Sequence, residues 1–367
     1  MFMRIRKSLL YSRTRQYFPM RSSSITDDRG KIENGQSILI DWPMVLKKPR
    51  VGIVQDPGIY PSWTKYAQFL DNNSFPYEIY HIHNQDWREK ARDFDVIMGI
   101  PSNASYDLEE VRGKYFLLET YLEKTCYPSM EHAFLFEDKK LEAFLSNLYG
   151  IPYVNTYVSS DKQDALHLIE NFTYPVVSKV VPCSGSVGVE LVRTKGHARR
   201  IVEQAFSNNG RKIHIVYARQ KNFVYFQDYI PNDGYDIRVV VVGNRVFGFY
   251  RLVPKGDFRA SGFHFEEWGD LPEKAMKIAR YAYKVIKSPQ LVVDMIPGLD
   301  GNFYINEFSP TVQMSTLHQL RVNGIAGAYV FDNDDSFYFE PGKYWVHELA
   351  LKEFFLNYYL PKLSIGS

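Results

Sequence analysis

Two apolar segments near the carboxyl end of the chain each contain one carboxylate, and this pair constrains the fold more than any other feature. One reads Val-Val-Asp294-Met-Ile and the other Tyr-Ile-Asn-Glu307-Phe. Runs rich in β-branched and aromatic residues predict strands, and the Gly-Leu-Asp-Gly link at 298–301 is short enough to make them hairpin neighbours. Asp294 and Glu307 can then face each other. Because buried carboxylates that close need a cation or a shared proton, the hairpin predicts a site for a hard cation such as Mg²⁺. The alternative, a solvated face, is disfavoured by the apolar flanks.

Cationic side chains lie on the strands expected before this hairpin. Asp236-Ile-Arg238 begins one strand, a turn signal follows at 243–244, and Arg251 lies near the end of the returning strand. Alternation along the hairpin can turn Arg238 and Arg251 to one face, and Arg259 follows. Arginines so placed can neutralise a phosphoryl group in transfer. For any single one, an ordinary exposed arginine is the alternative.

Lys179 lies on an expected strand, 175–181, which a small-residue turn joins to a returning strand, 187–192. Such a lysine supplies a point charge for a polyphosphate, and the turn can present backbone N–H groups to it. The Gly-Lys-Ser/Thr helix of a P-loop is absent. Taken alone, the segment is better interpreted as a structural hairpin with an exposed lysine.

Strands and helices alternate between residues 49 and 133, which predicts an open parallel sheet. Farther on, Asp138 opens an expected helix that Gly150 ends as a C-cap, and Asp161 is a candidate N-cap for the next helix. The chain of 367 residues is long enough for two or three packed units. We expect no transmembrane segment, since no run of 18 apolar residues occurs.

The net charge of +2 conceals an asymmetry. Residues 1–26 contain six basic and no acidic side chains, and removing those six leaves 38 basic against 42 acidic. The mildly acidic remainder argues against nucleic acid as a partner. Two cysteines are too few for a disulfide framework or a four-cysteine zinc site, so a reducing, cytoplasmic setting fits. The Arg- and Ser-rich beginning is also typical of an organellar transit peptide, and that alternative stays open.

Taken in order, these motifs resemble the ATP-grasp superfamily of ligases, nearest to its ribosomal-protein glutamate ligase and D-alanine–D-alanine ligase branches. The resemblance covers about residues 134–325. It implies an α/β protein with a Rossmann-like domain before a two-lobed α+β grasp. The implied parts are a poorly structured basic extension (1–48), a pre-grasp domain (49–133), a small lobe (134–222) and a large lobe with a C-terminal helix (223–367). The motifs that carry it are Asp138-Lys139, Pro-Val-Val-Ser-Lys179, Gly185-Ser186-Val187-Gly188, Gln227-Asp228-Tyr229-Ile230, Asp236-Ile-Arg238, Asp257-Phe-Arg259, Val-Asp294 and Glu307-Phe-Ser309-Pro310.

The resemblance also implies roles for these residues. Lys139 and Lys179 would contact ATP phosphates, the 183–188 loop (Ser184, Gly185, Ser186, Val187 and Gly188 among the binding residues) would close over them, and Asp236 would bind the ribose hydroxyls. The backbone from Gln227 through Asp228 and Tyr229 to Ile230 would read the adenine edge. Three arginines would be catalytic, clamping the γ-phosphate and an acyl-phosphate: Arg238, Arg251 and Arg259. The metal ligands would be Asp294, Glu307 and Ser309, holding one or two Mg²⁺ ions, with Mn²⁺ as a substitute.

The implied chemistry is ligation of a carboxylate to an amine through an acyl-phosphate, with ATP converted to ADP and phosphate. Small-molecule carboxylates and amines would be the substrates. One form of the reaction would add an amino acid to a cell-surface precursor or a peptide. The resemblance is also compatible with a homo-oligomer. Ser62, Trp63 and Lys65 are loose candidates for acceptor binding, an ordinary helix start with a core tryptophan being the stronger interpretation. One departure stands out: the family's Glu-x-Asn reads Glu-Phe-Ser309 here, which puts the second metal ion in doubt. The alternative function is therefore a nucleotide-binding scaffold with lost or weak turnover.

Overall fold

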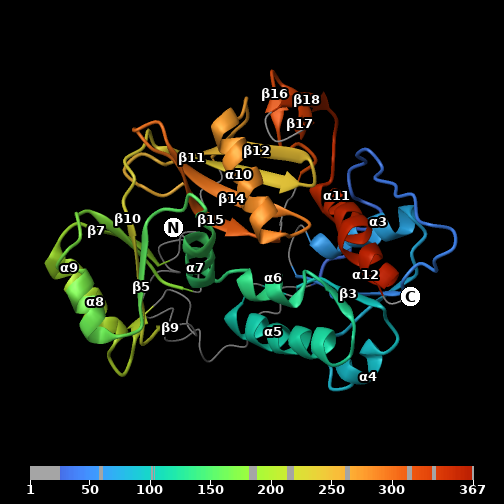
Figure 1. Ribbon diagram of the computed structural model, residues 1–367, viewed down its shortest axis with the longest axis horizontal. Helices are drawn as coiled ribbons and strands as arrows, with labels where there is room; N and C mark the ends of the chain where they lie inside the picture. Colours follow the sequence, from blue (N-terminus) through green and yellow to red (C-terminus); the bar gives the residue numbers. More distant parts are fainter. Residues whose placement is uncertain are drawn as a thin grey trace.

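The computed structural model describes residues 25–57, 61–100, 102, 104–181, 188–212, 219–260, 265–311, 316–332 and 336–365. Figure 1 shows three parts: a small green and yellow lobe, a larger orange lobe, and a blue to cyan domain beside which the red C-terminal helices pack. Within the described residues, no helix is both long enough and apolar enough to cross a membrane.

The first domain is built on a parallel sheet in the order β2-β1-β3-β4, as the alternating pattern predicted. Its central strands are fully buried on both faces, which is the rule for parallel strands covered by helices. The sequence analysis missed two short helices and the edge strand β4. The elements are β1 Val51–Ile53, α3 Ser62–Asn72, β2 Tyr77–Ile79, α4 Trp87–Ala91, β3 Val96–Met98, α5 Ser105–Thr120, β4 Thr125–Tyr127 and α6 Met130–Leu135.

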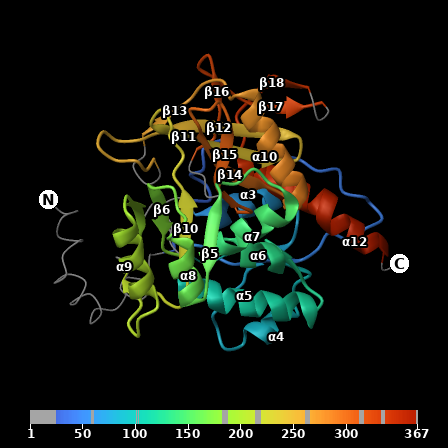
Figure 2. The same ribbon diagram turned by 60° about the vertical axis from the view of Figure 1, so that its left-hand side comes forward.

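The small lobe begins with the helix that carries Lys139. Asp138 caps this helix by accepting hydrogen bonds from the backbone N–H of Lys140 and Leu141, and Gly150 ends it at a φ of 65°. An antiparallel sheet in the order β5-β10-β6-β7 comes next, covered on one side by two helices (Figure 2). Its elements are α7 Lys139–Tyr149, β5 Thr156–Ser159, α8 Lys162–Leu168, β6 Val176–Lys179, β7 Val189–Val192, α9 Lys195–Ala205, β8 Arg211–Lys212, β9 Arg219–Gln220 and β10 Val224–Asp228.

The large lobe is a mainly antiparallel sheet with the path β15-β14-β11-β12-β17-β16. The expected hairpins β11–β12 and β14–β15 are present, whereas the last strands were not foreseen. Helix α10 lies across the sheet through its apolar stripe of Ala275, Met276, Ala279 and Ala282. The elements are β11 Tyr235–Val242, β12 Arg245–Leu252, β13 Glu266–Glu267, α10 Glu273–Ile286, β14 Leu291–Pro297, β15 Phe303–Ser309, β16 Arg321–Val322, β17 Ile325–Phe331 and β18 Phe337–Pro341.

The chain ends as one continuous helical stretch that joins the first domain to the large lobe. It comprises α11 Val346–Glu353, the π-helical turn η1 Phe354–Tyr359 and α12 Leu360–Ile365. Phe355 stacks on Phe69 and Phe75 of the first domain, while α11 also contacts β11. This stretch makes the two parts share one hydrophobic core.

Residues 25–48, which we call the N-terminal segment, form neither helix nor strand. They are nevertheless packed, which the sequence analysis did not anticipate. Ile38 and Trp42 are buried, and Trp42 contacts the rings of Phe75, Phe355 and Tyr359. The segment therefore covers the junction between α3 and the C-terminal helices.

Candidate nucleotide and ligation site

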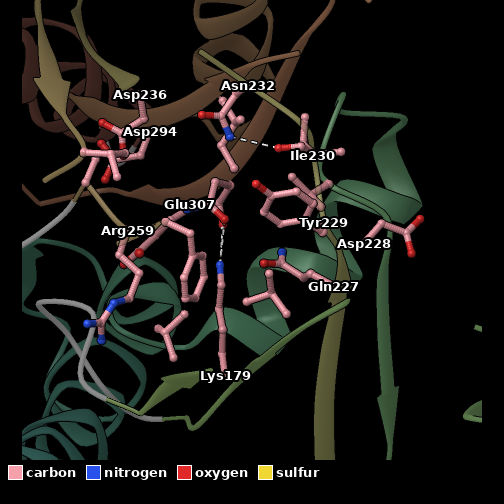
Figure 3. A pocket seen from close by; sticks show the side chains of 18 of the residues that line it. Lys179, Gln227, Asp228, Tyr229, Ile230, Asn232, Asp236, Arg259, Asp294 and Glu307 are labelled. Carbon is pink, nitrogen blue, oxygen red and sulfur yellow. Dashed lines mark hydrogen bonds between the residues drawn. The ribbon is translucent and has the colours of Figure 1, made fainter. Parts of the chain in front are cut away.

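A cavity between the small-lobe sheet and the large-lobe sheet collects most of the predicted site residues (Figure 3). It encloses about 870 Å³, part of it open to solvent. Valines from β6 and β7 form one wall and Ile296 of β14 lies among the lining residues of the other lobe, which gives the apolar surface that a planar base requires. The predicted residues that line the cavity are Lys139, Lys179, Gln227, Asp228, Tyr229, Ile230, Asp236, Arg251, Arg259, Asp294 and Glu307.

Asp294 lies at the centre of an ion-pair network on the large-lobe sheet. Arg238 is its direct cross-strand partner and donates from Nε and Nη2 to its two carboxylate oxygens, both at 2.8 Å. Arg251 reaches the same carboxylate at 2.9 Å and donates to both oxygens of Asp236 at 2.6 and 2.7 Å. Although burial opposes it, the two guanidinium groups hold the pKa of Asp294 well below its ordinary value.

Strand alternation therefore places Arg238, Arg251 and Asp294 on one face, as predicted from the sequence. The environment of Arg251 differs from that of Arg238. Its side chain is 9% exposed and locked between two aspartates, whereas that of Arg238 is 29% exposed. Arg251 nevertheless lines the cavity, while Arg238 is absent from the lining given by the described residues.

Both oxygens of Asp236 accept from Arg251, which bears on its predicted role. Burial raises the pKa of Asp236, and the Arg251 guanidinium opposes that rise. A ribose hydroxyl would have to share these oxygens with Arg251.

Glu307 pairs with Lys139 from the first turn of α7. The ammonium Nζ lies 2.7 Å from the Glu307 Oε1. Burial opposes it, but the charge of Lys139 lowers the pKa of Glu307. In the sheet, Glu307 is the cross-strand partner of Asp294, which confirms the facing carboxylates that the hairpin predicted.

Asn306 is a site residue that the sequence analysis missed. The register of β14 and β15 shifts after the Asp294–Glu307 pair, because Met295 pairs with Ile305 and Asn306 is left as an extra residue. Such a bulge breaks strict alternation, so neighbours Asn306 and Glu307 both line the cavity. The Asn306 Oδ1 accepts from Lys179 Nζ at 2.7 Å.

Lys179 is almost fully buried, and burial lowers its pKa to about 8. Its ammonium also donates to the Asn306 carbonyl at 3.3 Å and lies 6.0 Å from the centre of the Tyr225 ring. The expectation of an exposed structural lysine is therefore wrong. A buried ammonium at the cavity wall is a ready counter-charge for an anion.

A further buried carboxylate lies behind the lysines. Glu142, one turn after Lys139, accepts from the backbone N–H of Phe308 at 3.0 Å and from the Tyr153 hydroxyl at 3.3 Å. Burial raises the pKa of Glu142 to about 8. Through Phe308, Glu142 ties α7 to the strand that carries Glu307.

The predicted adenine linker leaves β10 at the cavity edge. The Gln227 side-chain amide donates to the Thr156 hydroxyl at 3.0 Å, and the backbone N–H of Asp228 donates to the Asn155 carbonyl at 3.0 Å. Asn232 donates to the Ile230 carbonyl at 2.9 Å. These bonds tie the linker to the small lobe on one side and to its own turn on the other.

Of the remaining predicted residues, Arg259 also lines the cavity. Arg259 forms a two-bond pair with Asp257 at 2.9 and 2.8 Å. The Ser309 hydroxyl donates to the Thr311 carbonyl at 3.0 Å, and Ser309 is absent from the cavity lining given by the described residues. Gly188, at a φ of 72°, accepts from the backbone N–H of Val180, while Ser184, Gly185, Ser186 and Val187 lie outside the described residues.

The sequence of residues 136–329 matches the family model of the RimK-like ATP-grasp domain. The chain belongs to the RimK-like ATP-grasp family. The match covers most of the small lobe, the large lobe as far as residue 329, and every large-lobe residue of the network described above. The resemblance inferred from the ordered motifs, including the mixed helix and strand architecture, is confirmed.

Two relatives and one solved structure are similar to this ATP-grasp chain. The glutamate–LysW ligase ArgX of Sulfolobus acidocaldarius is 28% identical over 175 residues, which are 45% of this chain and 57% of that protein, so the match spans little more than half of that relative. The α-aminoadipate–LysW ligase LysX of Saccharolobus solfataricus is 22% identical over 78% of this chain and 99% of its own length. The D-alanine–D-alanine ligase of Bacillus anthracis, solved with ATP, shares the fold with a TM-score of 0.50 at 20% identity, covering 71% of this chain and 86% of its own.

The donor set of this ATP-grasp site fits a hard divalent cation. Asp294 and Glu307 present carboxylate oxygens side by side, which is the ligand type that Mg²⁺ prefers. The charges of both carboxylates are neutralised by arginine and lysine side chains. A cation and a polyphosphate would therefore have to bind together, with the phosphate becoming the new partner of the arginines and lysines. Ser309, with its hydroxyl bonded to Thr311, does not fit as a ligand in this conformation.

The acceptor candidates of the pre-grasp domain separate in the structure. Trp63 and Lys65 are buried, and the Lys65 ammonium donates to the Pro61 carbonyl at 3.1 Å. Ser62 lines a small cavity together with Asp56 and with Thr311 of the large lobe. The backbone N–H groups of Ser62 and Trp63 both donate to Asp56 at 2.8 Å. Only Ser62 of the three therefore faces a cavity between the domains.

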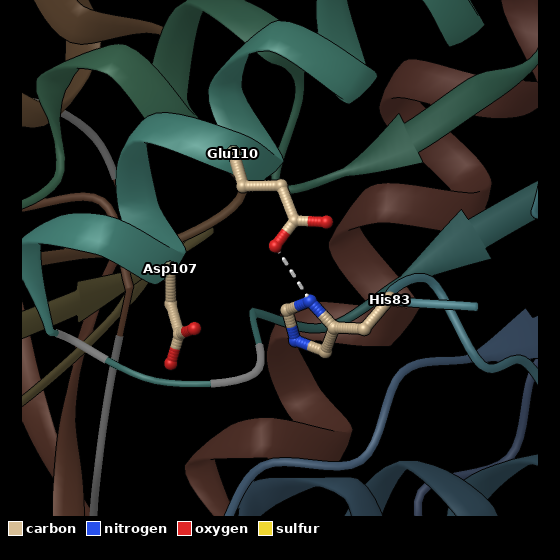
Figure 4. Close-up of side chains that lie close together, drawn as sticks. All are labelled: His83, Asp107 and Glu110. Carbon is tan, nitrogen blue, oxygen red and sulfur yellow. Dashed lines mark hydrogen bonds and ion pairs between the residues drawn. The ribbon is translucent and has the colours of Figure 1, made fainter. Parts of the chain in front are cut away.

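A second group of metal-ligating side chains lies in the pre-grasp domain (Figure 4). His83 Nδ1 lies 2.8 Å from Glu110, whose other oxygen pairs with Lys114, and Asp107 accepts from Ser102 at 2.5 Å. These groups are exposed or half-buried and already paired. A cation would have to displace Lys114, so we assign no metal to this group.

Proposed function

We propose that this protein is an ATP- and Mg²⁺-dependent carboxylate–amine ligase that works through an acyl-phosphate. The observation that carries the proposal is the single cavity in which Lys139 and Lys179 meet Asp294 and Glu307. Four cationic side chains line this cavity, these two lysines with Arg251 and Arg259, around the place where a polyphosphate fits beside a carboxylate pair. Phosphoryl transfer depends on such positioning and charge neutralisation.

Each residue has a task in this proposal. Lys179 and Lys139 bind phosphate oxygens. Asp294 and Glu307 would hold the Mg²⁺, which would supply positive charge beside the phosphoryl group. Arg259, which lines the cavity, orients the substrate carboxylate. The valines of β6 and β7, with the 227–230 linker, hold the adenine.

The proposed reaction has two steps. A carboxylate oxygen of the first substrate bonds to the γ-phosphorus while the bond to ADP breaks. The amine nitrogen of the second substrate then bonds to the acyl carbon, inorganic phosphate leaves, and the amine gives up one proton. The product is an amide, with ATP converted to ADP and phosphate.

The substrate class follows from the relatives. ArgX and LysX are named for joining glutamate or α-aminoadipate to LysW. We therefore propose an amino acid as one substrate and a peptide or a cell-surface precursor as the other. We propose the cavity beside Ser62 and Thr311, between the pre-grasp domain and the large lobe, as the place where the second substrate binds.

Hydroxylamine trapping tests the proposal. The full chain is incubated with ATP, Mg²⁺ and pools of amino acids and carboxylates, and both ADP and hydroxamates are measured. We expect carboxylate-dependent ADP release and a hydroxamate of the substrate that forms the acyl-phosphate, with neither in a Lys179→Ala variant. ATP-dependent thermal stabilisation without ADP release from any pool would favour the alternative, a binding scaffold, for which Ser309 in the Glu-x-Asn motif is the supporting observation.

A further inference from the structure

A second cavity lies outside the ATP-grasp cleft, between the N-terminal segment and helices α3 and α11. It encloses about 970 Å³, part of it open to solvent, and shares no lining residue with the nucleotide cavity among the residues that the structure describes. Residues 29–37 form one wall, and the C-terminal half of α3 forms another through Gln68 and Asp71. Trp345 and Glu348 come from the C-terminal part of the chain.

Glu348 is the unusual member of this lining. It is 1% exposed, and its Oε1 has no hydrogen-bond partner among the described residues. Within that part of the chain, the backbone N–H of Ile38 is the one donor that acts on its carboxyl group. Burial raises the pKa of Glu348 to about 7. A buried hydrogen-bond acceptor without a donor costs free energy of folding. A ligand that supplies this donor would therefore gain binding free energy.

The cations close to this cavity are already engaged. The Arg29 guanidinium donates to Asp27 at 2.7 and 3.0 Å, and the Lys65 ammonium lies against the Trp345 ring at 5.3 Å and the Pro61 carbonyl. The other polar groups on the walls are mainly neutral amides and hydroxyls, which suit the rest of a small polar molecule: Asn34, Gln36, Ser37, Gln68 and Asn72.

We propose that this cavity is a binding site for a small amine, whose protonated nitrogen donates to Glu348 while its hydroxyl or carbonyl groups bond the amide-lined wall. The site is independent of the nucleotide site, and the proposal does not rest on the ligase activity. It would respond to ammonium-type ligands through N–H donors and not through charge alone.

Ethanolammonium chloride is the probe, with tetramethylammonium chloride and sodium chloride at equal ionic strength as controls. Isothermal titration and thermal unfolding are measured on the full chain. We expect saturable binding and a raised Tm with ethanolammonium only, since tetramethylammonium has no N–H to donate. The variant Glu348→Gln should raise the Kd about 10- to 100-fold, the loss typical of one charge-assisted hydrogen bond.

Two more variants keep the test decisive. Asn34 is exposed at the cavity wall, so Asn34→Trp should block binding without disturbing buried residues, even where Glu348→Gln proves too unstable to measure. Lys179→Ala should lose the response to ATP and keep the response to ethanolammonium. Absence of binding to wild type would mean that the cavity holds only water, and equal binding to Asn34→Trp or equal stabilisation by tetramethylammonium would equally overturn the proposal.

Discussion

Lys179 combines burial with a proposed phosphate-binding role, and this combination gives ATP binding a pH dependence. Burial lowers its pKa to about 8, so the ammonium is present at neutral pH and is lost as the pH rises through 8 to about 9. The charge of an arginine persists throughout this range. The two side chains can therefore be told apart by titration.

We predict that ATP affinity of the wild type falls between about pH 7.5 and 9.5, whereas Lys179→Arg binds ATP with a flatter pH profile. Lys179→Ala should lose roughly 1.5–3 kcal/mol of ATP binding near neutral pH, the contribution of a charged hydrogen bond. Isothermal titration at several pH values checks both. Identical pH slopes for the lysine and arginine proteins would place Lys179 away from the phosphates.

The two ends of the Glu307-Phe-Ser309 motif should behave differently. Glu307 lines the cavity and pairs with Lys139, while the Ser309 hydroxyl is bonded to Thr311. We predict that Glu307→Gln abolishes Mg²⁺-dependent ADP release and that Ser309→Ala leaves its Mg²⁺ midpoint unchanged. The measurement is ADP release against Mg²⁺ concentration. A higher Mg²⁺ midpoint for Ser309→Ala would show that Ser309 is a metal ligand.

Arg251 is expected to act chiefly on stability. Its removal leaves Asp236 and Asp294 buried without half of their counter-charge, and breaking a buried pair in this way costs about 3–5 kcal/mol. Arg251→Gln should therefore unfold at much lower urea at neutral pH. The control, Arg245→Gln on the same strand, removes a more exposed pair with Glu340 and should cost about 1 kcal/mol or less.

The direction in which the stability effect of Arg251→Gln changes with pH follows from Asp294. Because its folded pKa is depressed, its contribution to stability is present above the unfolded pKa and is lost as the pH falls. The difference between Arg251→Gln and wild type should shrink as the pH falls from about 5 toward about 2. A difference that stays constant with pH would show that packing, and not charge, is the role of Arg251.

At the scale of elements, α7 connects the first domain to both lobes. Asp138 caps it, Lys139 reaches Glu307 from its first turn, and Glu142 bonds the backbone of β15. The start of this helix therefore sets both its stability and the position of one site lysine. Helix α8 is a matched case without a site residue, since Asp161 caps it through the backbone N–H of Asp164 at 2.8 Å.

We predict that Asp138→Ala and Asp161→Ala each lower the free energy of unfolding by about 0.5–2 kcal/mol, the usual value of an N-cap. Only Asp138→Ala should also weaken ATP binding, because fraying of the first turn releases Lys139. Urea denaturation and ATP titration of both variants are compared. Equal ATP affinities would mean that Lys139 is positioned by Glu307 alone.

At the scale of the whole molecule, one core runs through the pre-grasp domain and the large lobe, and the N-terminal segment is part of it. Trp42 packs on Phe75 of the first domain and on Phe355 and Tyr359 of the C-terminal stretch. Its indole N–H donates to the Leu46 carbonyl at 2.9 Å. The segment thus fixes how the first domain sits on the grasp.

We predict that Trp42→Ala lowers the free energy of unfolding by about 3–5 kcal/mol, as for other buried tryptophans. Val45→Ala, three residues later and 92% exposed, is the control and should change it little. Deleting residues 1–40 removes Ile38 and should cost folded protein for the same reason. Thermal unfolding of the three proteins checks this, and a deletion variant as stable as wild type would show that the segment is dispensable.

The sequence by itself determined the elements whose signals are local. Two apolar strand patterns and the short link between them predicted the facing pair Asp294 and Glu307. Side-chain chemistry at helix ends predicted the caps Asp138, Gly150 and Asp161. Such features depend on neighbours within a few residues, so a single chain displays them. The ordered motifs were also sufficient for the family.

Only the tertiary structure decided the features that depend on register and on distant packing. The bulge that turns Asn306 into the cavity arises from pairing with β14, and strict alternation would have hidden it. Three features join residues that are far apart in the chain: the burial of Lys179, the ion pairs of Arg251 with two aspartates, and the cavity beneath the N-terminal segment. Such contacts follow from how the sheets and helices pack against each other, and no local pattern in the sequence encodes that packing.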